Sequence, residues 1–335
     1  MKVTDALWRN LLDLRQKLRD AHLSENHSPD VIAMNETSFA MADHVDDVSN
    51  DLEKWSLLVT KTPQGSISSD YKAPLAIFEG RAFLHFHQNI DEQVEQIFKH
   101  YFPLAASRFV FKDQSFLITH VAQSLDGKVC TLNGASQWIG NDANLVHAHR
   151  IRAMVDGIIV GANTMRNEHP KLSVRHVSGD SPKRIVLCNS LDGFNDNDLN
   201  NTIVICREGS RACELACAAR GDCELIQLAS DAHGKVDVMS LRQRLYEHGI
   251  QSVMLEGGPS TVNQFIQQEA VDWLQIHIAP LLFGSGKSIY ECDTIECVAD
   301  ALTLNNAFFV QMDDAVMLSG ELSGKDSVKK ETARG

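Results

Sequence analysis

The sequence predicts an α/β protein whose larger part is a mostly parallel β-sheet flanked by helices, preceded by a small α+β module. From about residue 109 onward, short apolar runs typical of strands alternate with stretches of helical periodicity, which is the order expected of a parallel sheet. Before that point the elements are short and follow no regular alternation. The length of 335 residues also suits two domains.

The first module, residues 1–108, opens with an expected helix at 4–23, where leucines recur at helical spacing and Thr4 can cap the first turn. Residues 24–54 are polar and acidic, and we expect a loop or a weak helix there. The remaining expected elements are a strand at 55–60, a hairpin of 75–78 with 82–86, and a helix at 91–101 that Pro103 stops. This module contains no motif that indicates chemistry.

The second domain, residues 109–322, contains the alternating elements. Strands are expected at 115–122, 157–160, 184–188, 202–206, 224–228, 252–255 and 273–279, and helices at 143–155, 213–219, 238–248 and 261–269. The last run, 307–318, would close the sheet in antiparallel fashion. The polar tail at 323–335 is expected to be disordered.

Composition excludes several classes of protein. The chain has 31 Lys and Arg against 44 Asp and Glu, a formal charge of −13, whereas nucleic acids and anionic membranes attract basic proteins. No apolar run is long enough to span a bilayer, and acidic residues interrupt the N-terminal stretch where a signal peptide would lie. The eight scattered cysteines form no C-x-x-C pair, so we expect a reduced, cytoplasmic protein.

One strand-to-helix junction has the composition of a phosphate-binding turn. Residues 252–261 read SVMLEGGPST, so an apolar strand ends in Glu256 and is followed by Gly257, Gly258 and the start of a helix. Glycines let a phosphate approach the backbone, and the helix N-terminus offers free N–H groups. A tight turn without a ligand is the alternative, but a carboxylate at the end of a strand favours a ligand.

A second segment, 122–139, places polar groups after another strand. Asp126 and Gly127 form a turn by default. Ser136 and Trp138 are two residues apart, so in an extended chain both side chains point the same way, which suits a ring that is hydrogen-bonded and stacked. A core tryptophan beside a loop serine is the alternative.

The segment 146–185 is basic within an acidic chain. Its seven cations and three anions give a local sum of 7 − 3 = +4, which predicts an anionic small ligand. Solvated surface charges are the alternative, above all for Arg150 and Lys183. Thr164 follows the strand at 157–160 and therefore lies at another carboxyl end. The seven cations are Arg150, Arg152, Arg166, Lys171, Arg175, Lys183 and Arg184.

Other motifs predict no site. The H-x-H pairs at His85 and His147 have no acidic or cysteine partner at a metal-ligand spacing, so no metal is expected. The chain also contains neither the G-x-S-x-G motif of α/β-hydrolases nor the P-loop motif of nucleotide kinases.

Seven segments in the same order resemble the reductase domain of riboflavin biosynthesis, which in bacteria is the C-terminal half of a bifunctional pyrimidine deaminase–reductase. They are AQSLDGKV (122–129), GASQWI (134–139), RAMVDGIIVGANT (152–164), HPKLSVR (169–175), RIVLCNSL (184–191), LEGGPST (255–261) and HIAPLLFGSGKS (277–288). The resemblance implies a dihydrofolate reductase-like fold, NADPH as the cofactor and a homodimer. It also implies reduction of a phosphoribosylamino-pyrimidine, of the 5-amino-6-(5-phosphoribosylamino)uracil type, to its ribityl form.

The resemblance also assigns site residues. Substrate positions fall on Ser136, Arg152, Leu172, Arg175, Glu256 and His120, with the two arginines at the ribose phosphate. Cofactor positions fall on Ala122, Trp138, Thr164, Glu168 and Ser190 and on the turn from Gly257 through Pro259, Ser260 and Thr261 to Gln264. Hydride would pass from the nicotinamide to C1′ of the opened ribosylamine. The candidate catalytic carboxylates, from their strand-end positions, are Glu256 and then Asp126.

The sequence departs from the family pattern in four ways. His120 stands where the family usually has a lysine that contacts the ribose, Glu168-His169 replaces an acidic pair before Pro170, and Cys188 replaces a common Asp. The chain also lacks the H-x-E and P-C-x-x-C motifs of the zinc deaminase, so the first module is not that enzyme. The alternatives are therefore a related NADPH reductase of another pyrimidine or pterin-like compound, or a non-catalytic nucleotide-binding homologue.

Overall fold

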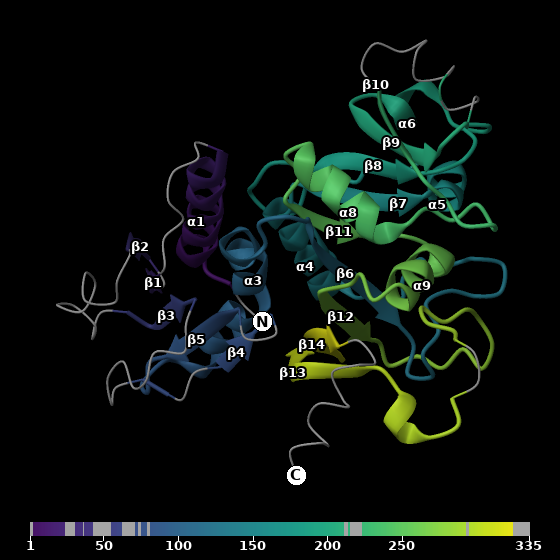
Figure 1. Cartoon of the computed structure of the whole chain (residues 1–335). Helices are drawn as coiled ribbons and strands as arrows, with labels where there is room; N and C mark the ends of the chain where they lie inside the picture. Colours follow the sequence, from purple (N-terminus) through teal and green to yellow (C-terminus); the bar gives the residue numbers. More distant parts are fainter. Residues whose placement is uncertain are drawn as a thin grey trace. The chain divides into compact units, whose positions relative to one another are not determined.

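The computed structural model of the chain divides between Lys112 and Asp113 into two compact units, each described here by itself (Figure 1). The described residues are 3–23, 31–35, 37–42, 55–61, 71–72, 75–78, 81–210, 214, 223–292 and 295–323. The expected helix at 213–219, apart from Glu214, and the expected disordered tail, apart from Ser323, lie outside the described residues.

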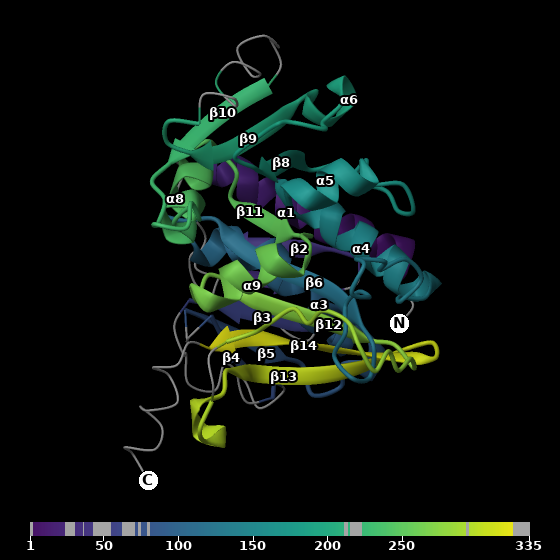
Figure 2. The ribbon, with the colours of Figure 1, turned by 90° about the vertical axis from the view of Figure 1, so that its right-hand side faces the viewer.

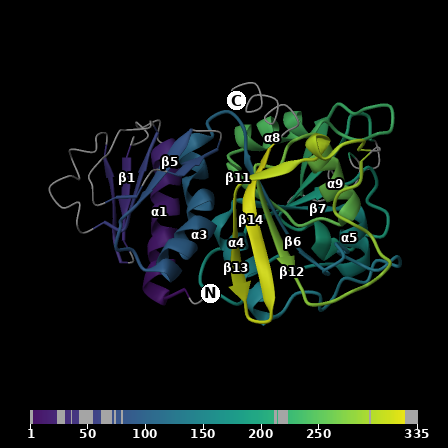
Figure 3. The same ribbon diagram turned by 90° about the horizontal axis from the view of Figure 1, so that it is seen from below.

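The N-terminal unit has an antiparallel sheet of five strands in the order β2-β1-β3-β5-β4, with the two helices of its described residues on one of its faces (Figure 3). Its elements are α1 (Asp5–Leu23), β1 (Val31–Met34), β2 (Phe39–Ala42), β3 (Leu57–Thr60), β4 (Leu75–Ile77), β5 (Ala82–Phe86) and α3 (Glu92–Val110). Thr4 caps α1 as expected, because its Oγ1 accepts from Leu7 N at 3.2 Å.

Two expectations for this unit are wrong. The stretch 24–54 contains β1 and β2 rather than only a loop or weak helix; β1 is a four-residue apolar run that is buried on both faces, so it shows no alternation. The helix expected to end at Pro103 continues to Val110. Burial of Phe102, Leu104 and Ala105 in the helix–sheet core outweighs the hydrogen bond that proline removes.

The C-terminal unit contains a sheet of nine strands in the order β10-β9-β8-β7-β11-β6-β12-β14-β13. The first seven strands in that order are mutually parallel, and β14 and β13 add to β12 in antiparallel fashion. The strands are β6 (Phe116–Gln123), β7 (Gly157–Gly161), β8 (Lys183–Leu187), β9 (Thr202–Arg207), β10 (Cys223–Leu228), β11 (Ser252–Leu255), β12 (Trp273–Ile278), β13 (Thr303–Met312) and β14 (Ala315–Ser323). The mostly parallel α/β fold predicted from the sequence is confirmed.

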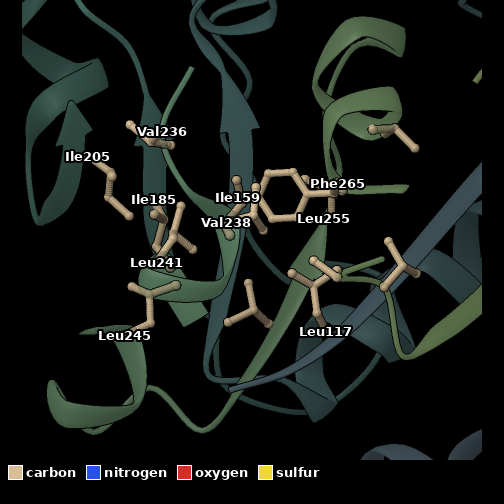
Figure 4. Packing of buried hydrophobic residues seen from close by; sticks show 14 of the residues in the cluster. Leu117, Ile159, Ile185, Ile205, Val236, Val238, Leu241, Leu245, Leu255 and Phe265 are labelled. Carbon is tan, nitrogen blue, oxygen red and sulfur yellow. The ribbon is translucent and has the colours of Figure 1, made fainter. Parts of the chain in front are cut away.

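Helices cover both faces of this sheet (Figure 2). The helices of this unit among the described residues are α4 (Asp142–Met154), α5 (Ala162–Glu168), α6 (Asp196–Leu199), α8 (Val238–Glu247), α9 (Pro259–Gln267) and the short η2 (Val298–Asp300), which has no buried residue. On the side of α8 and α9, branched side chains from alternate strand positions pack against Leu241, Leu245 and Phe265 to form the main core (Figure 4). Residues of α4 and α5, on the other face, line the candidate site together with the start of α9.

Sequence patterning missed three features of this unit. The run expected at 307–318 is two strands, because Asp313 adopts a positive φ of 56° and turns the chain back between β13 and β14. The short helices α5 and α6 were not expected, since four to seven residues give too few turns for a periodic signal.

None of the helices in the described part of the chain combines the length and the apolar composition that crossing a membrane requires.

Candidate active site

A cavity of about 1140 Å³ opens at the carboxyl ends of β6, β7 and β11. It is lined by the end of β6, one side of α4, the start of α5, the β11–α9 junction, and the loops at 129–142 and 287–291. Open parallel sheets bind their ligands in the crevice at the carboxyl ends of their strands. Thirteen of the residues predicted for the site line it: His120, Ala122, Ser136, Trp138, Arg152, Thr164, Glu168, Leu172, Glu256, Gly257, Gly258, Pro259 and Ser260.

An arginine–carboxylate pair lies in the cavity wall. Arg152 from the last turn of α4 donates from Nε to Glu256 Oε2 at 2.9 Å and from Nη2 to Glu256 Oε1, and its Nη1 donates to Ser173 O at 3.3 Å. The side chain of Arg152 is 10% exposed and that of Glu256 is 29% exposed. Such two-pronged pairing fixes the carboxylate plane while one face of the carboxylate still borders the cavity.

A second carboxyl group borders the same space. Glu168 ends α5 and lies in the lining with Glu256. Burial, and then the negative charge of Glu256, raise the pKa of the Glu168 carboxyl above its ordinary value. Two of the carboxyl groups in the lining therefore differ: that of Glu256 is paired with an arginine, and that of Glu168 holds its proton more tightly than usual.

The β11–α9 junction forms a backbone cradle. Gly258 is the N-cap of α9 and provides no side-chain cap for the first-turn N–H groups. A Cβ on Gly257 would lie 2.9 Å from Thr261 Cβ, and one on Gly161, at the end of β7, would overlap Thr261 Oγ1. Only glycines allow β7 and α9 to approach this closely, which leaves backbone dipoles facing the ligand space.

A second, smaller cavity of about 300 Å³ continues from the first. The two cavities share Asn163, Thr164, Gly258 and Ser260, and the second is also lined by Thr261 and Gln264. His233 and Lys235 provide imidazole and ammonium groups in its wall. A long phosphorylated cofactor fits this arrangement, because an uncapped helix N-terminus lies between a large cavity and a small one.

The loop with Ser136 and Trp138 differs from the extended chain assumed in the sequence argument. Trp138 lies in a turn with a positive φ of 69°, and its side chain is 90% exposed. The extended conformation expected at Trp138 is therefore wrong, although both residues line the cavity.

Asp126 lines neither cavity and instead holds a neighbouring loop. Its carboxylate accepts from Ser124 Oγ at 2.6 Å, Phe283 N at 3.0 Å and Gly284 N at 2.8 Å. The Ser124 hydroxyl first, and the backbone amides with it, lower the pKa of Asp126 to about 2. These contacts commit the carboxylate to the loop that leads to Lys287 in the cavity wall.

We expect Asp126→Ala to loosen residues 281–287, measured as faster amide hydrogen exchange after correction for intrinsic rates. Because the pKa of Asp126 is lowered, its contribution is complete above the ordinary aspartate pKa and is lost as the pH falls toward about 2. Protection of this loop in the wild type should therefore decline between pH 4 and about 2. Asp237→Ala, which removes the N-cap of α8, is the matched control and should leave 281–287 unchanged. Equal protection in wild type and Asp126→Ala would contradict this role.

Most of the cations of the basic segment 146–185 do not line the cavity. Of its seven cations, only Arg152 lines the cavity. Arg175 is exposed and donates to Ser173 Oγ at 3.1 Å, while Arg166 donates to the backbone oxygens of Ser190 and Asp192, both at 2.7 Å. Ser190, predicted to bind the cofactor, lies in that loop and lines neither cavity.

Asn144, Asn163 and Lys287 are among the polar residues of the lining that sequence reasoning missed. Asn144 lies two turns before Arg152 on the same side of α4, so projecting that helix from Arg152 would have found it. Asn163 adjoins Thr164, which was predicted. Lys287 lies within the segment 277–288, where the fold and not the pattern brings its ammonium to the cavity. Within the described ranges, no group of three or more His, Cys, Asp or Glu is arranged to hold a metal ion.

Comparisons with known proteins agree with this geometry. The model of the RibD C-terminal domain family matches residues 115–308, which is more than half of the chain. The 2,5-diamino-6-ribosylamino-4(3H)-pyrimidinone 5′-phosphate reductase of Aquifex aeolicus is 30% identical over 181 residues, covering 51% of this chain and 80% of that protein. The reductase of the same name from Methanothermobacter thermautotrophicus is 30% identical over 198 residues, covering 56% and 89%. The Aquifex aeolicus RibD is 29% identical over 188 residues, and there the match spans only 51% of its length.

Solved structures show the same fold. The riboflavin biosynthesis reductase Rib7 of Saccharomyces cerevisiae superposes with a TM-score of 0.54 at 24% identity, covering 69% of this chain and 100% of that one. A RibD of Acinetobacter baumannii superposes with a TM-score of 0.53 at 15% identity, covering 94% and 99%. The segments that suggested the resemblance, the strand-end cavity and the family model thus lie in the same unit, and the chain belongs to the RibD C-terminal domain family of riboflavin-biosynthesis reductases.

Proposed function

We propose that the chain is an NADPH-dependent reductase that converts the ribosyl group of a phosphoribosylamino-pyrimidine, of the 5-amino-6-(5-phosphoribosylamino)uracil type, to the ribityl form. The observation that supports this most directly is one cavity that joins the α9 N-terminus to the Arg152–Glu256 pair. The first feature suits a phosphorylated cofactor and the second suits a polyhydroxylated substrate. The two reductases that the chain covers over most of their length are named for a 2,5-diamino pyrimidinone, which carries the same kind of ribosylamino 5′-phosphate group.

For the cofactor, the residues present fit a dinucleotide across both cavities. The diphosphate would lie at the N–H groups of α9, next to Thr164 and Asn163, with the nicotinamide in the larger cavity and the adenosine end in the smaller. When bound, NADPH supplies the hydride for C1′ of the substrate. The ammonium group of Lys235 favours NADPH over NADH, because it would place positive charge where a further phosphate binds, and His233 adds a hydrogen-bonding group beside it.

For the substrate, Glu256 would accept hydrogen bonds from ribose hydroxyls while Arg152 holds the carboxylate in place. Glu168, whose carboxyl borders the same cavity and has a raised pKa, would hold a proton near the opened sugar nitrogen. The Nζ of Lys287 has no hydrogen-bond partner among the described residues and lies in the lining, so it can meet the ribose phosphate with or instead of the arginines first assigned.

The direct test is anaerobic incubation of the protein with NADPH and 5-amino-6-(5-phosphoribosylamino)uracil or its 2-amino counterpart, followed by loss of NADPH absorbance and identification of the ribityl product. Growth rescue of a host that lacks the reductase but keeps a separate deaminase is the matching test in cells. Absence of turnover with both pyrimidines would overturn the proposal. NADPH binding without hydride transfer in stopped-flow measurements would instead support a non-catalytic homologue.

A cofactor-specificity prediction follows from the smaller cavity. Lys235→Ala should raise the KM for NADPH about two- to fivefold, the scale of one exposed ion pair, while the KM for NADH stays unchanged. The difference should shrink at high salt because exposed charges are screened. Lys171→Ala, an exposed lysine outside both cavities, is the control. Equal changes in KM for both cofactors would contradict a phosphate contact at Lys235.

The second candidate function is the reduction of another pyrimidine or a pterin-like compound by a related NADPH-dependent reaction. His120 favours it, because a buried imidazole stands in the lining where the family's lysine was expected. We also propose, from the family alone, a homodimer in the cytoplasm, which light scattering and fractionation would test.

A further inference from the structure

One side of α4 forms a stripe along the cavity. Asn144, Ala148 and Arg152 are spaced by four residues and all three line it. Eight residues of helix span about 12 Å. The stripe therefore runs from the Arg152–Glu256 pair, where we place the ribose, past the small side chain of Ala148 to Asn144. A planar ring attached to the sugar can lie over Ala148 and present its edge to Asn144.

The amide of Asn144 is held in one orientation. Its Oδ1 is 2.9 Å from His120 Nε2, and because a carbonyl oxygen only accepts, Nε2 is the N–H donor of that bond. On the other side the amide packs against Gly140, where an added Cβ would overlap Asn144 Nδ2. The oxygen of the amide therefore faces His120, and its NH2 group faces away from the imidazole.

The imidazole that orients the amide is itself fixed. His120 is 6% exposed and packs edge-to-face on His147 with ring centroids 5.0 Å apart. His147 Nε2 lies 2.8 Å from Gln275 Oε1 on β12, so the neighbouring ring is tied to the sheet. Burial, and then the nearby His147, His277 and Arg152, lower the pKa of His120 well below its ordinary value, while its bond to Asn144 opposes the shift. A neutral, enclosed imidazole keeps its N–H on Asn144.

The NH2 group of Asn144 remains available to a ligand. Among the described residues it has no hydrogen-bond partner, and it is not one of the enclosed unsatisfied atoms. An oriented amide donor in a cavity is a hydrogen-bond site for an acceptor oxygen. It is a poor neighbour for an amino group, since two donors would face each other without an acceptor.

We propose that Asn144 determines substrate specificity by donating from Nδ2 to the ring substituent at position 2 of the pyrimidine, and so selects an oxygen there over an amino group. This inference rests on the proposed function. The two pyrimidines considered above differ at that substituent: the uracil form has an oxygen at position 2 and the diamino form has an amino group. The enzyme would then act on the deaminated pyrimidine, so a deamination reaction must precede it. His120 is a positioning residue that acts through Asn144.

The test compares kcat/KM for the two substrates in the wild type and in Asn144→Asp. The wild type should favour the uracil form about ten- to a hundredfold, the range expected when a ligand covers a donor and leaves it without an acceptor. Aspartate keeps the shape of asparagine and can still accept from His120, but it offers the cavity an acceptor. The ratio should therefore move at least about tenfold toward the diamino form. The KM for NADPH should not change.

Two further variants separate positioning from folding. His120→Gln can still donate to Asn144 Oδ1 and should retain the substrate ratio, whereas His120→Leu should lose it at an unchanged NADPH KM. Asn197→Ala, on α6 and outside both cavities, is the control. It should alter neither the ratio of kcat/KM for the two substrates nor the KM for NADPH.

The outcomes distinguish this inference from the proposed function. Turnover of neither pyrimidine by the wild type overturns the proposed function and this assignment with it. Turnover of both at equal kcat/KM, or an unchanged ratio in Asn144→Asp, overturns the assignment alone. A preference of the wild type for the diamino form does the same.

Discussion

Replacing Glu256 with Gln should lower the rate of hydride transfer about ten- to a hundredfold, the range expected when the charged acceptor of a substrate's hydrogen bonds is lost. Glutamine keeps the size of the side chain and can accept one hydrogen bond from Arg152, but it loses the charge that pairs with both prongs of the guanidinium. Single-turnover measurements with NADPH already bound isolate this step from cofactor binding. Hydride transfer at the wild-type rate in Glu256→Gln would rule out an essential ionised carboxylate at this position.

The same variant should change the pH profile through Glu168. The negative charge of Glu256 is one of two causes that raise the pKa of Glu168, the larger being burial. Removing that charge should lower the pKa of Glu168 toward its ordinary value and move the corresponding limb of the kcat profile to lower pH. A limb that stays in place would show that the titrating group is not Glu168.

Glu247→Gln is the matched control for both measurements. Glu247 lies on α8, accepts from Arg244 at 2.8 Å, and is 43% exposed. The substitution removes one prong of a surface ion pair, which contributes little to stability or activity. Thermal unfolding of both variants checks that any loss in Glu256→Gln does not come from a disturbed fold.

Replacing Gly161 with Ala should weaken NADPH binding about ten- to a hundredfold, the effect of a methyl group forced into a packed contact. Gly161 has a φ of −80° that alanine adopts readily, so the backbone itself is not strained. The new Cβ would meet Thr261 Oγ1 and push the first turn of α9 away from the end of β7. Titration of the protein with NADPH, followed by fluorescence, measures the loss.

A double variant separates this steric cause from other effects of Gly161→Ala. Combining it with Thr261→Ala removes the atom that the new methyl group meets, so the pair should bind NADPH about as well as Thr261→Ala alone. If the double variant instead shows the full sum of both losses, the contact between residues 161 and 261 is not the cause. Such additivity would contradict a cofactor cradle built on the close approach of β7 and α9.

The order of elements in the C-terminal unit was predictable because each strand and long helix repeats a local pattern. Runs such as 157–160 and 252–255 are short, apolar and followed by glycines, so a few neighbouring residues are enough to predict a strand and its end. Elements without such a signal were missed: β1 is buried on both faces, and α5 spans only seven residues. Pro103 misled the prediction because local propensity did not include the core that encloses α3.

Site residues that are neighbours in the sequence could be predicted. Site contacts between residues far apart in the sequence could not, because the order of strands in the sheet brings them together. The turn from Gly257 to Ser260 is contiguous, and its place in the cavity follows from one strand end. Asp126 also lies just beyond a strand, yet its side chain turns to Phe283 and Gly284, about which the sequence near Asp126 contains no information. Trp138 does line the cavity, but the extended backbone expected there was wrong for a related reason, since its positive φ of 69° places it in a turn.

By itself, the sequence determined the α/β class, the seven segments of the family and the strand-end residues that border the ligand space. Only the tertiary structure decided that Arg152 pairs with Glu256, that one of seven clustered cations reaches the cavity, and that His120 orients Asn144. The physical reason is strand order. Hydrophobic periodicity is set by neighbours along the chain, whereas α4, β6 and β11 meet only because β11 inserts between β7 and β6 in the sheet.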